Sequence, residues 1–172
     1  ELAAMESGYA WRPLTVRRAG AQTAAKSVMG TFVSGNYFRV FGLSPAAGRL
    51  LSDADDQKGA PLTAVMSYDA WQQDYAGDPS VVGSAFYINA KPATIIGVAP
   101  KGFYGDRIDT NPPKYFLPMN AMDPVIGAPY FNDPDTQWAY IIGRVRPGTV
   151  VGAVQAKASA LLKQQFAWLK TF

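Results

Sequence analysis

Carboxylates are the side chains of this sequence best suited to chemistry, because its 172 residues include no histidine and no cysteine. Without imidazole or thiol groups, Ser-His-Asp and Cys-His catalysis are excluded, as are disulfides, iron–sulfur clusters and nearly all zinc, copper and haem sites. An enzyme built from this chain would depend on carboxylates, Lys, Tyr, Ser or a metal bound by oxygen. We therefore start from the expectation that the protein is not an enzyme.

The densest group of carboxylates lies between Asp53 and Asp56, and its spacing invites comparison with a calcium loop. An EF-hand loop needs Asp or Asn at position 5, glycine at position 6 and glutamate at position 12. Counted from Asp53, those positions hold Gln57, Lys58 and Ala64. The pattern fails at all three, so we interpret the segment as an exposed acidic turn that caps nearby backbone donors.

Two further acidic groups leave metal chemistry open. Asn132, Asp133 and Asp135 surround a proline, which favours a tight turn and a loose cation site at most. A hydrolase with paired carboxylates needs two of them about 5–10 Å apart across a cleft. Asp106, Asp109 and Asp133 are the candidates for a metal-dependent hydrolase, although no motif selects them.

Motifs for nucleophilic catalysis, nucleotides and nucleic acid are missing. The sequence has neither G-x-S-x-G nor a glycine-rich loop ending in Gly-Lys-Ser/Thr. The net charge is +3, and the local basic groups are Arg12 with Arg17 and Arg18, and Arg144 with Arg146. Neither group is interleaved with aromatic residues for base stacking, so we interpret them as solvated strand faces and expect no nucleic-acid partner.

Aromatic residues in predicted loops are the remaining candidates for a binding site. They are Phe103, Tyr104, Tyr130 and Phe131. Such side chains either anchor a partner or substrate or fold back onto the body of the domain. We expect no catalytic residue, metal or cofactor, and we keep these four as possible contact residues.

The elements that must position these residues follow from hydrophobic periodicity. Alternation predicts strands, a 3.6-residue repeat predicts helices, and Gly and Pro mark the turns between them. The predicted strands are 12–18, 27–33, 62–67, 114–117 and 138–146, with a hairpin over 84–99, helices over 36–41, 68–75 and 151–169, and an irregular segment over 119–136. Because strands do not alternate with long helices, this order favours an α+β fold with mixed or antiparallel sheets and a long C-terminal helix.

The sequence lacks an apolar run of about 18 residues, the length that spans a bilayer. Its longest apolar stretch covers residues 93–99 and has the length of a strand. The chain also begins at Glu1 without a basic and apolar leader, so we interpret it as a fragment whose targeting and membrane segments lie outside it.

Three segments together resemble a known family. They are VSGNYFRVFGLSPAAGR (33–49), AVMSYDAWQQDYAGDPSVVGSAFYINAKPATIIGVAPKGF (64–103) and IIGRVRPGTVVGAVQAKASALL (141–162). In this order and spacing they are similar to the periplasmic core domain of MacB-like/FtsX-type ABC transporter permeases. The resemblance covers residues 10–170, and the irregular segment 119–136 is not part of it.

The resemblance implies a domain between the first two transmembrane helices of a permease. It implies a porter-like lobe, here residues 1–35 and 137–172, and an inserted β-rich lobe, residues 36–136, with crossings near 34–36 and 135–137. The domain would be periplasmic and non-catalytic, and it would couple ATP-driven movement to export or to periplasmic partners. The implied partners are an ABC ATPase subunit or domain, a periplasmic adaptor and a second permease copy.

Two other classes of function stay open at this point. One is a soluble module that binds an apolar or peptide compound, and the other is the metal-dependent hydrolase. Both are compatible with the absence of histidine and cysteine.

Overall fold

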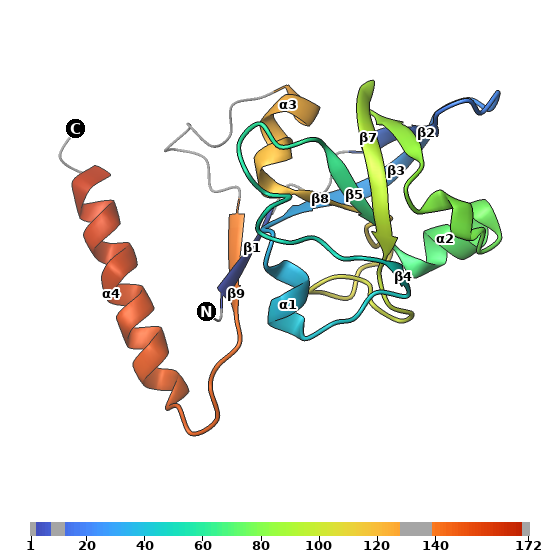
Figure 1. The fold of residues 1–172 in the computed structure, drawn as a ribbon. Helices are drawn as coiled ribbons and strands as arrows, with labels where there is room; N and C mark the ends of the chain where they lie inside the picture. The colour runs from blue at the N-terminus through green and yellow to red at the C-terminus, as the bar shows by residue number, and fades with distance from the viewer. Residues whose placement is uncertain (1–2, 8–12, 128–138, 170–172) are drawn as a thin grey trace.

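The computed structural model describes residues 3–7, 13–127 and 139–169. These residues form a mixed α+β domain, so the predicted fold class is confirmed (Figure 1). The strands are β1 (Ala3–Ser7), β2 (Pro13–Arg18), β3 (Lys26–Val33), β4 (Ala47–Gly48), β5 (Thr63–Met66), β6 (Ala85–Ile88), β7 (Lys91–Val98), β8 (Tyr115–Pro118) and β9 (Ala139–Gly143). The helices are α1 (Tyr37–Phe41), α2 (Tyr68–Tyr75), α3 (Met122–Ile126) and α4 (Val151–Leu169), with 3₁₀ turns η1 (Pro79–Val81) and η2 (Met119–Ala121).

Six of the strands close into a ring. Their order is β2-β6-β7-β5-β8-β3, and β3 pairs again with β2. The pairings of β3 with β8 and of β5 with β7 are parallel, and the other four are antiparallel. Closure leaves these strands with few unpaired edges, which limits edge-to-edge aggregation.

Alternate side chains of the strands pack into two separate cores. The first core lies inside the ring and takes residues from all six of its strands, together with α2, α3 and η2. The second lies on the outer side of β3, β5 and β8, where it is covered by α1. On β8, for example, Tyr115 and Leu117 enter the first core while Phe116 enters the second. Strands buried on both faces have near-continuous apolar sequences, and the second half of β3, up to Val33, is buried on both faces.

Most predicted elements are confirmed, and the differences are local. The strands at 12–18, 27–33, 62–67 and 114–117, the hairpin and the helices at 36–41, 68–75 and 151–169 all appear within a few residues of their predicted bounds. The segment 119–136 was predicted to be irregular, but its first part forms η2 and α3. The predicted strand 138–146 is shorter, because β9 ends at Gly143.

The turn of the β6–β7 hairpin places two non-glycine residues in the left-handed region. Asn89 has φ 46° and Ala90 has φ 63°. Asparagine tolerates this region, whereas alanine is strained there by about 1–2 kcal/mol. We expect Ala90→Gly to raise the free energy of unfolding by about 0.5–1 kcal/mol once the greater freedom of glycine in the unfolded chain is deducted.

Urea unfolding of the wild type and Ala90→Gly measures this effect. Ala85→Gly, at an exposed strand position on the same hairpin, is the matched control and is expected to lower stability by about 0.5–1 kcal/mol. A less stable Ala90→Gly protein would contradict the prediction.

The terminal elements form a smaller unit beside the ring. Strand β1 pairs with β9 over five residue pairs, from Ala3 opposite Gly143 to Ser7 opposite Ala139. Figure 1 shows α4 standing apart from the strands, next to β9, and every described side chain from Val151 to Gln164 is exposed. Among the residues that the structure describes, none forms a helix with both the length and the hydropathy needed to cross a bilayer.

Candidate functional site

Phe103, the first of the predicted contact residues, packs into a cluster of aromatic rings under α1. Phe103 lies 6.2 Å from Tyr37, 5.8 Å from Phe38, 5.6 Å from Phe41 and 5.7 Å from Phe116, measured between ring centroids. Its ring therefore packs on the second core, and only part of it is accessible.

The other predicted contact residues have different environments. Tyr104 is 44% exposed, so it presents a ring to solvent directly beside the cluster. Tyr130 and Phe131 lie outside the described residues. Contact of any of the four with a partner or substrate stays a prediction.

The acidic turn, residues 53–56, stabilises the fold by binding neighbouring segments of the chain. Asp55, whose side chain is 7% exposed, accepts two hydrogen bonds of 2.7 Å from the guanidinium of Arg49. It also accepts bonds from the backbone N–H and the hydroxyl of Ser52. The Arg49 guanidinium, with the two Ser52 donors, outweighs desolvation and lowers the pKa of Asp55 to about 2. The carboxylate is thus ionised and fully engaged, which leaves it no role as a metal ligand.

The neighbouring carboxylates are used in the same way. Asp56 accepts the backbone N–H of Gly35 at 3.1 Å and that of Asn120 at 2.7 Å, so it joins the start of α1 to η2. Asp53 pairs with the exposed guanidinium of Arg39 at 3.1 Å. The interpretation of this segment as a cap for backbone donors agrees with the contacts of Asp55 and Asp56, whereas Asp55 is buried rather than exposed.

Two of the candidate hydrolase carboxylates make contacts with residues close to them in the chain. Asp106 pairs with its neighbour Arg107, at 3.0 Å to Nε, and Asp109 accepts the backbone N–H of Asn111 at 3.0 Å. Asp133 lies outside the described residues. Within the described ranges 3–7, 13–127 and 139–169, no three acidic side chains are grouped so that they could hold a metal ion.

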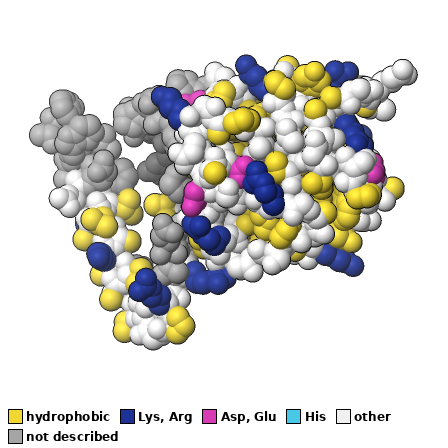
Figure 2. All heavy atoms as spheres, in the orientation of Figure 1, with side chains coloured by type: hydrophobic (Ala, Val, Ile, Leu, Met, Phe, Trp, Pro, Cys, Tyr) yellow, Lys and Arg dark blue, Asp and Glu magenta, His cyan; other side chains and the backbone are white. Residues whose placement is uncertain are grey.

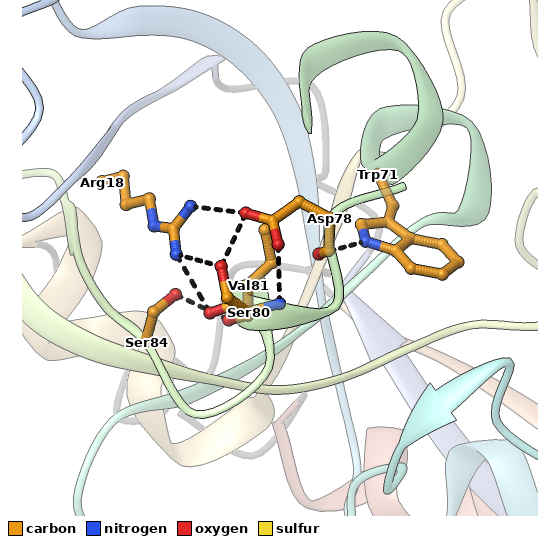
Figure 3. A network of polar contacts seen from close by, with 6 residues as sticks. All are labelled: Arg18, Trp71, Asp78, Ser80, Val81 and Ser84. Atoms are coloured by element: carbon orange, nitrogen blue, oxygen red, sulfur yellow. Dashed lines mark hydrogen bonds and ion pairs between the residues drawn. The ribbon is translucent and has the colours of Figure 1, made fainter. Parts of the chain in front are cut away.

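The motif D-P-S at residues 78–80 and Trp71, seven residues before it, take part in one polar network (Figure 3). Asp78 caps η1 by accepting the N–H of Ser80, and its carboxylate also accepts a bond from Arg18 of β2 at 3.2 Å. The indole N–H of Trp71 donates to the carbonyl oxygen of Asp78 at 2.8 Å. The network attaches α2 and η1 to the ring.

Two glycines mark a close backbone approach. Gly48 of β4 lies opposite Gly97 of β7, and a Cβ at Gly97 would overlap the backbone of Arg49. The G-R and I-I-G-V motifs are therefore needed so that the segment carrying Arg49 can lie flat on β7. The motifs at Gly48, Gly97 and Asp78 thus serve the fold.

Arginines gather on the surface outside the second core. Arg39 and Arg49 line a shallow groove of about 360 Å³ between α1 and residues 43–51. Arg144 reaches the same place from the end of β9, because a methyl group at Gly42 would lie 3.4 Å from both of its terminal guanidinium nitrogens. Figure 2 shows Lys and Arg side chains gathered around the lower ends of β9 and α1.

Spacing alone does not group these arginines, and the sequence places Arg144 and Arg146 on the solvated face of a predicted strand. They lie after the end of β9, in the turn before α4. Two of the three arginines at the groove are ion-paired, Arg39 with Asp53 and Arg49 with Asp55. The signal that could have found the arginines is the lack of acidic residues after Asp135.

Three solved structures are similar to this chain in fold. The periplasmic region of MacB from Actinobacillus actinomycetemcomitans matches with a TM-score of 0.63 and 17% identity over 94% of this chain. A domain of a putative permease protein from Porphyromonas gingivalis matches with a TM-score of 0.64 and 17% identity over 97% of this chain. The extracellular domain of the noncanonic ABC-type transporter YknZ from Gram-positive bacteria matches with a TM-score of 0.56 and 14% identity over 86%. The fold is that of extracytoplasmic regions of permeases.

The family follows from a sequence model. The model of the MacB-like periplasmic core domain matches residues 2–161. The chain therefore belongs to this family, as a periplasmic domain of a MacB-like ABC transporter permease. No curated protein sequence matches it. The chain spans 66%, 64% and 66% of the MacB, Porphyromonas and YknZ structures respectively.

Proposed function

We propose that this domain is non-catalytic and couples ATP-driven movement of transmembrane helices to export or to periplasmic partners. In this proposal the hydrolysis takes place on a separate ABC ATPase domain or subunit. The domain would move with a second permease copy to open and close a periplasmic cleft, and it would present that movement to a periplasmic adaptor.

The observation that carries the proposal is the narrow attachment of the β1–β9 pair to the ring. Five residue pairs join β1 to β9, whereas a single pair, Glu6 opposite Val33, joins β1 to β3. The side chains of Ala4 and Ile142 add contacts with the second core. Arg107 also lies over the ring of Tyr140 of β9, 4.9 Å from its centroid, and Arg144 lies beside Gly42. A closed ring attached to a strand pair by one backbone pairing and these side chains can rotate as one body about that contact.

The chain is expected to pass between the two lobes near residues 34–36 and 135–137, and these two places differ as candidates for a hinge. Residues 34–36 are held by Asp56, whose carboxylate accepts the N–H of Gly35, and they make a poor hinge. Residues 135–137 lie outside the described residues. We place the compliant point at the β1–β3 contact.

The division into lobes 1–35 with 137–172 and 36–136 stays a prediction. The strand pairing joins β2 and β3 to strands of the middle segment. A deletion of 36–136 would therefore open the ring, so movement has to be tested in the intact chain.

Spin labels on introduced cysteines test the movement, because this chain has no cysteine of its own. In the full permease with its ATPase and no other accessible thiol, we expect the Thr94→Cys/Gln155→Cys pair to give different distance distributions with and without ATP. Thr94 lies on the ring and Gln155 on α4, and both are exposed.

A pair within the ring, Thr94→Cys/Ser27→Cys, is the matched control and should give one distribution in both states. Identical distributions for the Thr94→Cys/Gln155→Cys pair in the two states would contradict the proposed coupling. A change in the control pair would contradict the rigid ring.

A further inference from the structure

One face of β9 contacts the body of the ring at three places. Because strand side chains alternate between faces, Tyr140 and Ile142 point the same way, and Arg144 follows directly after the strand. Ile142 packs against the second core, and Tyr140 lies under the guanidinium of Arg107. The guanidinium of Arg144 lies against Gly42, which caps the C-terminal end of α1. We term Tyr140, Ile142 and Arg144 the β9 row.

The guanidinium that meets Tyr140 is held in place by its own loop. Asp106, whose side chain is 16% exposed, accepts one bond of 3.0 Å from Nε of Arg107 and another of 3.2 Å from Nη2. Two such bonds fix the plane of an arginine fork. Phe103 anchors the same loop to the second core through its contacts with Phe41 and Phe116. The ring therefore presents to β9 a cation whose position is already set.

The Tyr140 contact lies at the pivot, and the Arg144 contact lies away from it. Tyr140 is opposite Glu6 of β1, and Glu6 is opposite Val33 of β3 in the single backbone pair that joins the strand pair to the ring. From Tyr140, β9 continues for three residues, about 10 Å, before the chain reaches Arg144. A rotation about the pivot therefore moves Arg144 away from α1 further than it moves Tyr140 away from Arg107.

We propose that the β9 row is a latch that holds the ring in the orientation seen here. Arg107 and Tyr140 hold the pivot, and Arg144 holds the far end against α1. The inference rests on the proposed function, in which the ring moves relative to the β1–β9 pair. A cation at the C-terminal end of a helix or over an exposed aromatic ring contributes about 0.5–1 kcal/mol, which corresponds to about a two- to five-fold change in population. Contacts of this strength bias the orientation and still allow it to change.

Spin labels at Thr94→Cys on the ring and Ile141→Cys on β9 test the latch in the 172-residue chain. Both positions are exposed, and Ile141 points away from the β9 row because it lies on the other face of the strand. We expect one dominant distance in the wild-type background. Arg144→Gln should raise the population at other distances about two- to five-fold. Tyr140→Leu should broaden the dominant distance, whereas Tyr140→Phe, which keeps the aromatic face, should leave it unchanged.

The charge-matched control is Arg146→Gln, which removes the other exposed arginine of the turn before α4 and should leave the distribution unchanged. The pair within the ring, Thr94→Cys/Ser27→Cys, should keep one distance in every variant. Identical distributions in the wild type and in Tyr140→Leu/Arg144→Gln would overturn the latch, and so would an equal change in Arg146→Gln. Because the measurement needs neither ATP nor the transmembrane helices, the latch and the proposed coupling can fail separately.

Discussion

Phe116→Ala is expected to lower the free energy of unfolding by about 3–5 kcal/mol, the usual cost of removing a fully buried phenylalanine. Phe116 is fully buried on the outer side of β8, and its ring contacts those of Tyr37, Phe38 and Phe103. Its removal leaves a cavity under α1 that the short strand cannot close. Urea unfolding followed by tryptophan fluorescence measures the loss.

Two variants show whether the effect comes from the cavity. Phe116→Leu refills most of the space and should cost about 1–1.5 kcal/mol. Tyr104→Ala removes a neighbouring aromatic ring that is 44% exposed and should cost less than about 1 kcal/mol. If Phe116→Ala were no less stable than Tyr104→Ala, the aromatic cluster would not be the core that holds α1 on the ring.

Asp55→Asn is expected to lower the free energy of unfolding by about 2 kcal/mol at neutral pH. The reason is the pKa of Asp55, which Arg49 and Ser52 lower from an ordinary value of 3.8 to about 2. The matched control is Asp53→Asn, in the same turn. Its ion pair with Arg39 is exposed on both sides, and its loss should change stability by less than about 0.5 kcal/mol.

The same carboxylate gives a pH dependence with a definite sign. Because the pKa of Asp55 is lower in the folded than in the unfolded chain, its contribution is complete above about pH 4. It is lost as the pH falls through the folded value of about 2. The stability difference between the wild type and Asp55→Asn should therefore shrink between pH 4 and pH 2. A difference that stays constant over this range would show that the Arg49–Asp55 pair does not depend on the charge of Asp55.

The sequence was sufficient for local elements and insufficient for their long-range partners. Alternation located β2 and β3 and the β6–β7 hairpin, because half-buried strands have a period of two residues. It gave no sign that β3 pairs in parallel with β8, since such a pairing depends on residues more than 80 positions apart. Strand β1 was missed because its sequence, AAMES, contains no β-branched or aromatic residue and does not alternate between apolar and polar residues.

The candidate site shows the same limit. The loop position of Phe103 suggested an exposed contact, and the return of that loop onto α1 and Phe116 could not be known from spacing. Asp55 caps the nearby N–H of Ser52 as interpreted, but Asp55 is buried, and Asp56 accepts the N–H groups of Gly35 and Asn120, which are distant in the chain. The approach of Arg144 to Gly42 joins the end of β9 to α1, and only the folded chain brings these segments together.

The closed ring also sets an order on the synthesis of the protein. Strands β2 and β3 are adjacent in the chain and can pair at once, but β3 meets β8 only once residues 115–118 have been made. Until β8 emerges, the other edge of β3 and the apolar surfaces of β5 and β7 have no permanent cover. Nascent chains that stop before residue 118 would then present open, apolar strand edges, which are the features that holdase chaperones bind and that promote aggregation. The ring that resists distortion in the finished permease is therefore the part of the domain that is completed late.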